Sequence, residues 1–265
     1  MGMSSHPSSV TLPAAEKPYP TLPAFFSRRF PHIPASGWRA RILAGKVLDQ
    51  HGTAVTLDTP YTPHQRLYYF REVDEEPRIP FAEKILFQND EIVVACKPHF
   101  LPVIPGGRYV NECLLGRLQR HTGNPALTPV HRIDRDTAGL VLFSANPITR
   151  GLYHALFARG EVAKTYNALA DSTQAPGETE WWVENRIVRG EPWCRRKVTA
   201  GLVNARSHIR LVETRGQRAR FSLTPLTGKT HQLRLHMSGI GFPIVNDRYY
   251  PALQPQAVDD FASPL

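Results

Sequence analysis

The sequence contains few cysteines and no long apolar run. Its three cysteines, Cys96, Cys113 and Cys194, are widely spaced and form no C-x-x-C pair. This spacing argues against a disulfide framework and a thiolate zinc site, and it predicts a reduced, cytoplasmic setting. No segment approaches the length of a membrane span, and the N-terminus lacks the apolar core of a signal peptide. We therefore expect no membrane partner.

Acidic residues are also in the minority, with 23 Asp and Glu against 32 Lys and Arg, a net charge of +9. This balance favours a phosphate-rich partner, nucleic acid before membrane, although many basic proteins bind neither. Gly106-Gly107 is not followed by a phosphate-binding pattern such as G-x-G-x-x-G or GK[ST]. His231 and His236 are five residues apart, which does not place two zinc ligands on one helical face.

The composition divides the chain into a small N-terminal part and a larger domain. Residues 1–20 are rich in Ser and Pro and predict a disordered tail. Residues 21–73 form the expected small domain, and an acidic, proline-containing linker at 74–80 leads into a domain over residues 81–265.

The small domain has a basic, helical pattern. Leu22, Phe25 and Phe26 begin a helical stripe, and Ser36 is a suitable N-cap for a second short helix. With the hairpin that follows, this arrangement resembles a divergent S4 RNA-binding domain; a helical adaptor with a solvated charged face is the alternative. The candidate RNA-binding residues here are Arg28, Arg29, Arg39, Arg41 and Lys46.

The most informative stretch is residues 131–144. Its second half, Leu140-Val141-Leu142-Phe143, is an apolar run of the length of a buried strand. If its first half is extended, Arg132 and Asp134 project from one face. A carboxylate at the edge of a core beside arginines is a plausible chemical centre, and an ordinary ion pair or turn cap is the alternative.

Four further segments follow this stretch. Residues 149–159 have a helical pattern, and residues 162–170 alternate as a strand that contains Tyr166. Thr230 is a suitable cap for a helix that runs to about Ser238 and ends at Gly239. Between them, residues 186–220 combine many basic residues with nearby tryptophans, which favours RNA contact over a solvated sheet face. The candidates there are Arg195, Arg196 and Lys197.

Several of these segments resemble the motifs of the RluA family of RNA pseudouridine synthases. HRIDRDTAGLVL, starting at His131, resembles HRLDRDTSGLLL. Lys164-Thr165-Tyr166 resembles the family's K-x-Y element, and TGKTHQLRLHM, starting at Thr227, resembles TGRTHQLRVHM. Residues 241–250 resemble its G-x-P-I-x-x-D-x-x-Y segment.

The resemblance implies a fold and a set of roles. It implies an α+β catalytic domain with a mixed, largely antiparallel sheet, and a reaction that needs no cofactor or metal. By the resemblance Asp134 is the catalytic aspartate and Arg234 its ion-pair partner. Tyr166 packs on the target base, and Arg132 inserts into the RNA in place of the flipped base. Leu235 offers an apolar contact beneath the uracil.

The function implied is isomerisation of uridine to pseudouridine in structured RNA by a monomer, with 23S rRNA as the first choice and tRNA second. An RNA-binding relative without catalysis is an alternative. A third is a glycoside-type hydrolase that uses Asp134 and Asp136. Family members usually continue with a Leu- and His-rich segment and a last sheet strand, so we expect a shortened C-terminus here.

Overall fold

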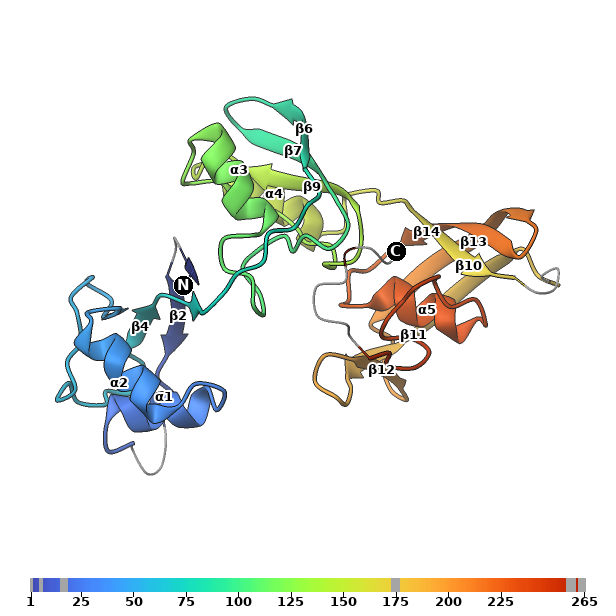
Figure 1. Cartoon of the computed structure of the whole chain (residues 1–265). Coiled ribbons are helices and arrows are strands. Elements are labelled where there is room, and N and C mark those ends of the chain that lie inside the picture. Colours follow the sequence, from blue (N-terminus) through green and yellow to red (C-terminus); the bar gives the residue numbers. More distant parts are fainter. Residues whose placement is uncertain (1, 5–6, 15–18, 173–176, 256–260, 262–265) are drawn as a thin grey trace. The chain divides into compact units, whose positions relative to one another are not determined.

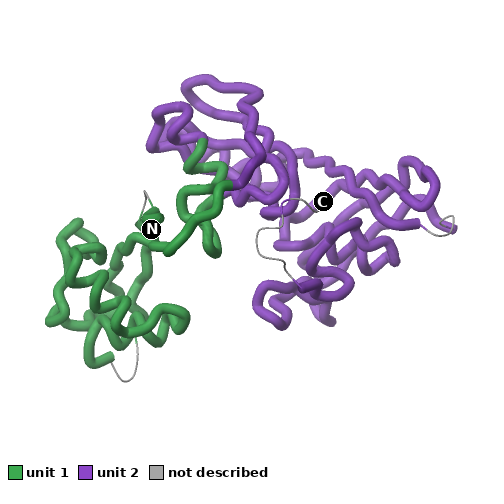
Figure 2. Tube along the Cα trace, viewed as in Figure 1, with its two compact units in different colours: residues 1–78, 104–117 green, residues 79–103, 118–265 purple. Residues whose placement is uncertain are grey.

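The computed structural model describes residues 2–4, 7–14, 19–172, 177–255 and 261. The chain forms two compact units (Figure 2). Unit 1 comprises Met1–Arg78 with Ile104–Arg117, and unit 2 comprises Ile79–Val103 with Leu118–Leu265.

Unit 1 packs two short helices against a small antiparallel sheet (Figure 1). Thr21 caps the first helix by accepting a hydrogen bond from the Ala24 N–H. The apolar faces meet where Phe26 stacks on Trp38 at 4.3 Å between ring centroids. The elements are α1 (Leu22–Arg29), α2 (Ala35–Leu43), a sheet in the order β2 (Ser8–Thr11), β4 (Arg66–Tyr69), β3 (Val47–Leu48), and the pair β1 (Gly2–Met3) with β5 (Glu72–Val73).

The prediction of a disordered tail over residues 1–20 is wrong for much of that segment; residues 1, 5–6 and 15–18 lie outside the described part. Ser8–Thr11 pairs with Arg66–Tyr69, and Leu12 is fully buried in the unit 1 core. The Ser- and Pro-rich composition gave no sign of this strand, because an edge strand needs apolar side chains only at alternate positions. Here those residues are Val10 and Leu12.

The expected cap of the second helix is also corrected. The helix begins at Ala35, and Pro34 rather than Ser36 is its N-cap. The Pro34 carbonyl accepts hydrogen bonds from the Gly37 and Trp38 N–H groups at 2.9 and 3.3 Å. The fixed φ of proline suits this entry into a helix, and Ser36 lies exposed in the first turn.

Unit 2 begins with a four-stranded antiparallel sheet in the order β6-β7-β9-β8. Its central strands are apolar on alternate residues, and Val93, Ala95, Val141 and Phe143 are buried. The strands are β6 (Lys84–Gln88), β7 (Ile92–Lys97), β8 (Thr128–Pro129) and β9 (Gly139–Ser144). Two helices accompany them in the chain, α3 (Leu114–Thr122), which begins in unit 1, and α4 (Arg150–Ala158).

The second sheet of unit 2 has five antiparallel strands in the order β10-β14-β13-β11-β12. Helix α5 (Gln232–Gly239) lies along this sheet (Figure 1), and Met237 packs into the core of Ile209, Phe221 and Leu223. The strands are β10 (Tyr166–Asp171), β11 (Glu180–Arg189), β12 (Arg196–Thr199), β13 (Ala205–Arg215) and β14 (Arg218–Pro225).

The α+β class predicted from the sequence is confirmed. Within the described ranges, every pair of neighbouring strands is antiparallel. The strand expected over residues 162–170 begins only at Tyr166 and continues to Asp171. No helix in the described part of the chain is long and apolar enough to cross a membrane.

Candidate active site

Asp134 lies in the connection between β8 and β9. Its carbonyl accepts a hydrogen bond from the Thr137 N–H at 3.1 Å, which closes a turn, and β9 begins at Gly139 with φ +138°. Only glycine adopts this φ without strain, so the glycine at position 139 is what allows the chain to turn here. The Asp134 side chain is 30% exposed. The turn therefore presents a carboxylate that solvent or a ligand can reach.

A buried lysine anchors this turn. The Lys97 side chain is fully buried at the end of β7, and its ammonium donates to the carbonyls of Leu101 at 2.7 Å and of Arg135 at 2.9 Å. Burial lowers the pKa of Lys97 to about 7, although the charges of Asp136 and Asp134 oppose this shift. The backbone beside Asp134 is thus tied to the neighbouring strand.

Helix α5 brings Arg234 to Asp134. Arg234 Nη1 donates to Asp134 Oδ2 at 3.2 Å, and the Arg234 side chain is only 11% exposed. The two residues are 100 positions apart in the chain. The pairing expected from the sequence motifs is present as a half-buried, charge-assisted contact.

Arg234 also binds a second, more deeply buried carboxylate. Its Nε and Nη2 donate to the two oxygens of Asp247 at 2.7 and 2.5 Å, and Asp247 is 3% exposed. Asp247 also accepts the Tyr249 and Tyr250 N–H groups at 2.8 and 3.2 Å. Burial alone would lower the pKa of Arg234, but the hydrogen bonds and charge of Asp247, aided by Asp134, raise it above its usual value. The guanidinium is therefore held charged and in one orientation.

His231 lies beside the same carboxylate. Its Nε2 is 3.9 Å from Asp134 Oδ2, and its Nδ1 is 3.0 Å from the Tyr250 hydroxyl. Burial lowers the pKa of His231, and the charge of Asp134 only partly reverses this. The imidazole is consequently neutral at physiological pH.

The helix cap predicted at Thr230 is wrong. Helix α5 starts after His231, which is the N-cap in the left-handed conformation at φ +59° and makes no side-chain capping bond. The Gln232 side chain instead accepts from the Lys229 N–H at 3.0 Å, which fixes the loop before the helix. A capping pattern in sequence cannot show that His231 adopts this backbone conformation beside Asp134 and Tyr250.

Tyr166 is the first residue of β10 and lies half-buried opposite Leu223 of β14. Burial, together with the negative charge of Asp134, raises the pKa of Tyr166. Its hydroxyl therefore stays protonated at physiological pH. Arg132 is exposed two residues before Asp134, where no partner holds its guanidinium among the residues that the structure describes.

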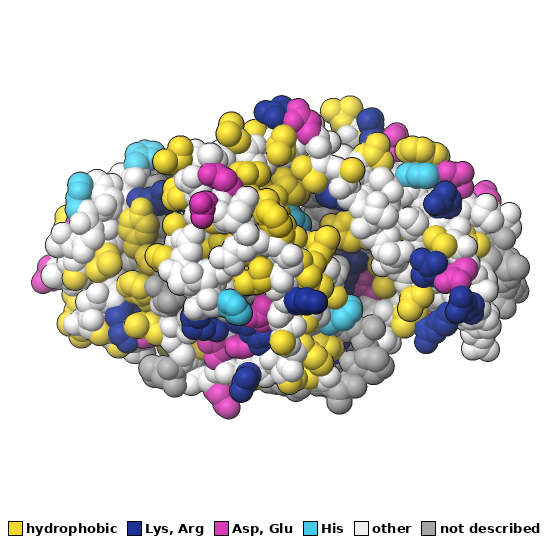
Figure 3. Space-filling view, turned by 90° about the horizontal axis from the view of Figure 1, so that it is seen from above, with side chains coloured by type: hydrophobic (Ala, Val, Ile, Leu, Met, Phe, Trp, Pro, Cys, Tyr) yellow, Lys and Arg dark blue, Asp and Glu magenta, His cyan; other side chains and the backbone are white. Residues whose placement is uncertain are grey.

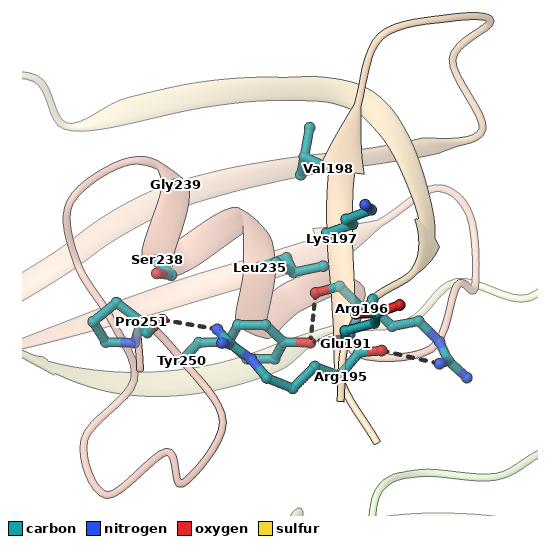
Figure 4. Close-up of a pocket in the computed structure, with 11 residues that line it drawn as sticks. Glu191, Arg195, Arg196, Lys197, Val198, Leu235, Ser238, Gly239, Tyr250 and Pro251 are labelled. Atoms are coloured by element: carbon teal, nitrogen blue, oxygen red, sulfur yellow. Dashed lines mark hydrogen bonds between the residues drawn. The ribbon is translucent and has the colours of Figure 1, made fainter. Parts of the chain in front are cut away.

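Leu235 and the basic candidates of residues 195–197 meet in one pocket. Leu235 lines a pocket with the hairpin of β11 and β12, which carries Arg195, Arg196 and Lys197 (Figure 4). The Arg196 N–H donates to the Tyr250 hydroxyl at 2.7 Å, and the Arg195 guanidinium lies 5.1 Å from the Tyr250 ring centroid. Tyr250 thus connects this basic hairpin to His231.

The five basic candidates of unit 1 fall into two groups. Arg28, Arg29 and Arg39 are exposed, whereas Arg41 and Lys46 form ion pairs with Glu72. Burial would raise the pKa of Glu72, but the hydrogen bonds from Lys46 and Arg41 lower it. The first three are better placed to contact phosphates. On the face of the molecule in Figure 3, Lys and Arg side chains lie in small separate groups among hydrophobic and acidic ones.

Asp247, His231 and Tyr250 are site residues that sequence reasoning did not identify as such. All three lie in quoted motifs, His231 in the segment that starts at Thr227 and Asp247 and Tyr250 at the Asp and Tyr positions of residues 241–250, but the motifs alone assigned them no role. Within the described ranges, no group of three His, Cys, Asp or Glu side chains is placed to hold a metal ion.

The candidate site of this α+β chain thus combines an accessible aspartate, an arginine held in one orientation and a half-buried tyrosine. Residues 91–239, more than half of the chain, match the family model described as RNA pseudouridylate synthase. The chain therefore belongs to the RNA pseudouridylate synthase family, and it is an isomerase of that family.

Named relatives support this assignment. An uncharacterized RNA pseudouridine synthase of Synechocystis is 26% identical over 85% of this chain and 78% of its own length. Ribosomal large subunit pseudouridine synthase D of Salmonella typhimurium is 30% identical over 76% of this chain and 64% of its own length. The mitochondrial tRNA pseudouridine(32) synthase of Saccharomyces cerevisiae is 31% identical over 63% of this chain and 37% of its own.

A solved structure is similar as well. Human RNA Pseudouridylate Synthase Domain Containing 4 superposes with a TM-score of 0.51 and 26% identity. The match covers 66% of this chain and 73% of the human one. The α+β fold is therefore shared with a solved member of the family.

Proposed function

We propose that this chain converts specific uridines of structured RNA to pseudouridine, with 23S rRNA as the first substrate and Asp134 as the catalytic residue. The observation that carries the proposal is the contact of Arg234 with two unequal carboxylates. Asp247 takes two of its donors in a buried pair, and Asp134 takes a third while 30% exposed.

This arrangement suits the chemistry. The reaction breaks the bond between C1′ of the ribose and N1 of uracil, turns the base and joins C1′ to C5, and the proton of C5 is lost while N1 regains one. An ionised carboxylate can attack C1′, as carboxylates do at glycosidic carbons, or remove a proton from the sugar. In both routes Asp134 must stay charged near low-dielectric surroundings, and Arg234 provides the compensating charge.

The target base must leave its stack to reach Asp134. Tyr166 is half-buried within the electrostatic reach of Asp134 and offers a flat, protonated phenol against which a uracil can pack. Arg132 is exposed beside the same turn, in a position suited to filling the gap that the flipped base leaves in the RNA. Leu235, which follows Arg234 on α5, offers the apolar contact beneath the base.

Two observations favour ribosomal RNA. The Salmonella relative named for the large ribosomal subunit matches 214 residues, whereas the yeast tRNA enzyme matches 172. Unit 1 adds two basic helices on a small sheet, and we propose that it serves as an S4-like RNA-binding module that uses Arg28, Arg29 and Arg39. A tRNA substrate is the second candidate. The proposal includes a monomer in the cytoplasm.

The test is tritium release from RNA labelled at uracil C5, with rRNA and tRNA offered separately. Wild-type protein should release tritium from rRNA, and Asp134→Asn should release none. Release from tRNA alone would move the assignment to the second substrate. Binding of both RNAs with release from neither would support a relative that binds RNA without catalysis.

A further inference from the structure

A pocket of about 300 Å³ lies between the β11–β12 hairpin and helix α5, next to the candidate active site (Figure 4). Arg195, Arg196 and Lys197 line it together with one acid, Glu191. Three cations against one acid favour an anion. Its volume is at the lower end of small-ligand sites, about the scale of a single nucleotide.

The cations of this pocket are not equivalent. Arg195 Nη2 donates to the Pro251 carbonyl at 2.8 Å, and Arg196 Nη1 donates to the Arg195 carbonyl at 3.1 Å. Lys197 is exposed and forms no ion pair with any residue in the described part of the chain. Arg195 and Arg196 keep their charge, because a carbonyl is neutral, but the backbone holds their guanidinium groups, so Lys197 is the cation best able to turn towards a ligand.

The remaining lining is apolar. Leu235 of α5, Val198 of β12 and the Tyr250 ring border the same space, and Val198 is 47% exposed. A ligand with both a charged group and a flat apolar part would satisfy both halves of the lining. A nucleotide has this combination, because its phosphate is anionic and its base has an apolar face.

The pocket and the candidate catalytic carboxylate are separated by a single imidazole. Tyr250, which lines the pocket, contacts His231 Nδ1 at 3.0 Å, and the other nitrogen of that ring is 3.9 Å from Asp134. Leu235 follows Arg234 directly on α5. A nucleotide in the pocket would therefore be a neighbour of one whose ribose lies at Asp134.

We propose that this pocket binds the nucleotide next to the isomerised uridine on the same RNA strand. Lys197 contacts its phosphate, and Val198 and the Tyr250 ring contact its sugar and base. The assignment rests on the proposed function and deepens it, because it makes the hairpin a second contact that fixes the strand while the target base is flipped.

The first test compares two variants that remove one positive charge from the same hairpin. Lys197→Gln alters the lining of the pocket. Arg189→Gln is the control: Arg189 is exposed and pairs with Arg196 across the hairpin, but it does not line the pocket. RNA affinity is measured by filter binding over a range of salt concentrations. Lys197→Gln should weaken binding roughly fivefold and reduce the salt slope by about one, and Arg189→Gln should change affinity less than about twofold.

Equal losses in the two variants would overturn the pocket assignment. Because this test measures binding, it is independent of tritium release. A wild-type protein that binds RNA but releases no tritium would refute the proposed function; a specific loss in Lys197→Gln would then support nucleotide binding in the pocket but not its place beside an isomerised uridine.

The second test uses an RNA whose modified uridine has been mapped, with one neutral methylphosphonate at either neighbouring phosphate. One of the two replacements should weaken binding to wild type about fivefold and should cause no further loss in Lys197→Gln, since both changes remove the same contact. Independent, additive losses at both phosphates would contradict the proposal. Inorganic phosphate alone should not compete at the concentrations where RNA binds.

Discussion

The two sides of Arg234 differ sharply although each presents a carboxylate. Asp247 is 3% exposed and accepts two guanidinium bonds and two backbone N–H bonds. Asp134 is 30% exposed and accepts one guanidinium bond at 3.2 Å. The saturated carboxylate fixes the arginine, and the unsaturated one keeps lone pairs for a substrate. The contrast separates a positioning residue from a candidate catalytic residue.

The largest effect on turnover is expected at Asp134, the more exposed carboxylate. Asp134→Asn keeps the shape of the side chain but removes its charge, so turnover should fall by about a thousandfold or more. RNA affinity should change little because Asp134 is one small side chain among the many groups that contact the RNA. Single-turnover assays and filter binding check the two parts separately, and appreciable turnover in this variant would refute the role of Asp134.

A smaller effect on turnover is expected at Asp247, the buried carboxylate. Asp247→Asn leaves Arg234 with one charged partner, so its guanidinium loses its fixed orientation and turnover should fall roughly a hundredfold. Because the pair is buried, unfolding free energy should also fall by about 3 kcal/mol. Measurement of kcat and KM under conditions where the variant is folded should place most of the loss in kcat.

The matched control for Asp247→Asn is Asp171→Asn. Asp171 also pairs with an arginine, Arg218, but its side chain is 66% exposed. Loss of such a surface pair should change stability by less than about 1 kcal/mol and leave turnover unchanged. Similar effects of the two variants would remove the distinction between buried and exposed pairs.

Two histidines extend the comparison. His231 lies beside Asp134 at the candidate site. His131 forms no hydrogen bond or ion pair with Asp134; its ring stacks on Phe157, and its Nε2 accepts a hydrogen bond from the Leu142 N–H at 3.1 Å. Burial lowers the pKa of His131 to about 4 from an ordinary 6.5. As the pH falls, the imidazole of His131 is therefore protonated in the unfolded chain before it is protonated in the folded one. The free energy of unfolding that His131 contributes above pH 6.5 is lost as the pH falls towards 4.

Stability should consequently decrease by about 2 kcal/mol for His131 alone between pH 7 and pH 5. Urea unfolding at both pH values measures this decrease in wild type and in His131→Gln, whose amide oxygen can accept the same backbone bond. The variant should show a flatter dependence on pH, and an unchanged dependence would assign the effect to other groups.

The smallest effect concerns the arginines of unit 1. Replacing the exposed Arg28 and Arg29 with Gln should weaken RNA binding roughly fivefold and reduce the salt slope by about two, without loss of stability. Arg41→Gln should mainly lower stability, because Arg41 is paired with the half-buried Glu72. If Arg41→Gln weakens RNA binding as much as the double variant, the division between exposed and paired arginines is incorrect.

The sequence predicted those features that depend on neighbouring residues. The apolar run at residues 140–143 lies in β9, and the helical pattern at 149–159 corresponds to α4. The contact between Asp134 and Arg234 followed from two motifs rather than from periodicity, since nothing local joins residues 100 positions apart.

Features that depend on distant pairing were missed. The strand Ser8–Thr11 exists because Arg66–Tyr69 provides its hydrogen-bond partners, and a Ser-rich tetrapeptide carries no signal of its own. Asp247 lies in a loop whose position is set by Arg234 itself, and His231 adopts a conformation that no helix-capping rule predicts. Each of these depends on tertiary contacts.

The most direct test of the central claim is the single-turnover rate of three proteins, wild type, Asp134→Asn and Asp247→Asn, on one saturating RNA labelled at uracil C5. The account predicts tritium release by wild type, slow but measurable release by Asp247→Asn, and none by Asp134→Asn. Release by Asp134→Asn at a rate equal to or above that of Asp247→Asn would contradict it.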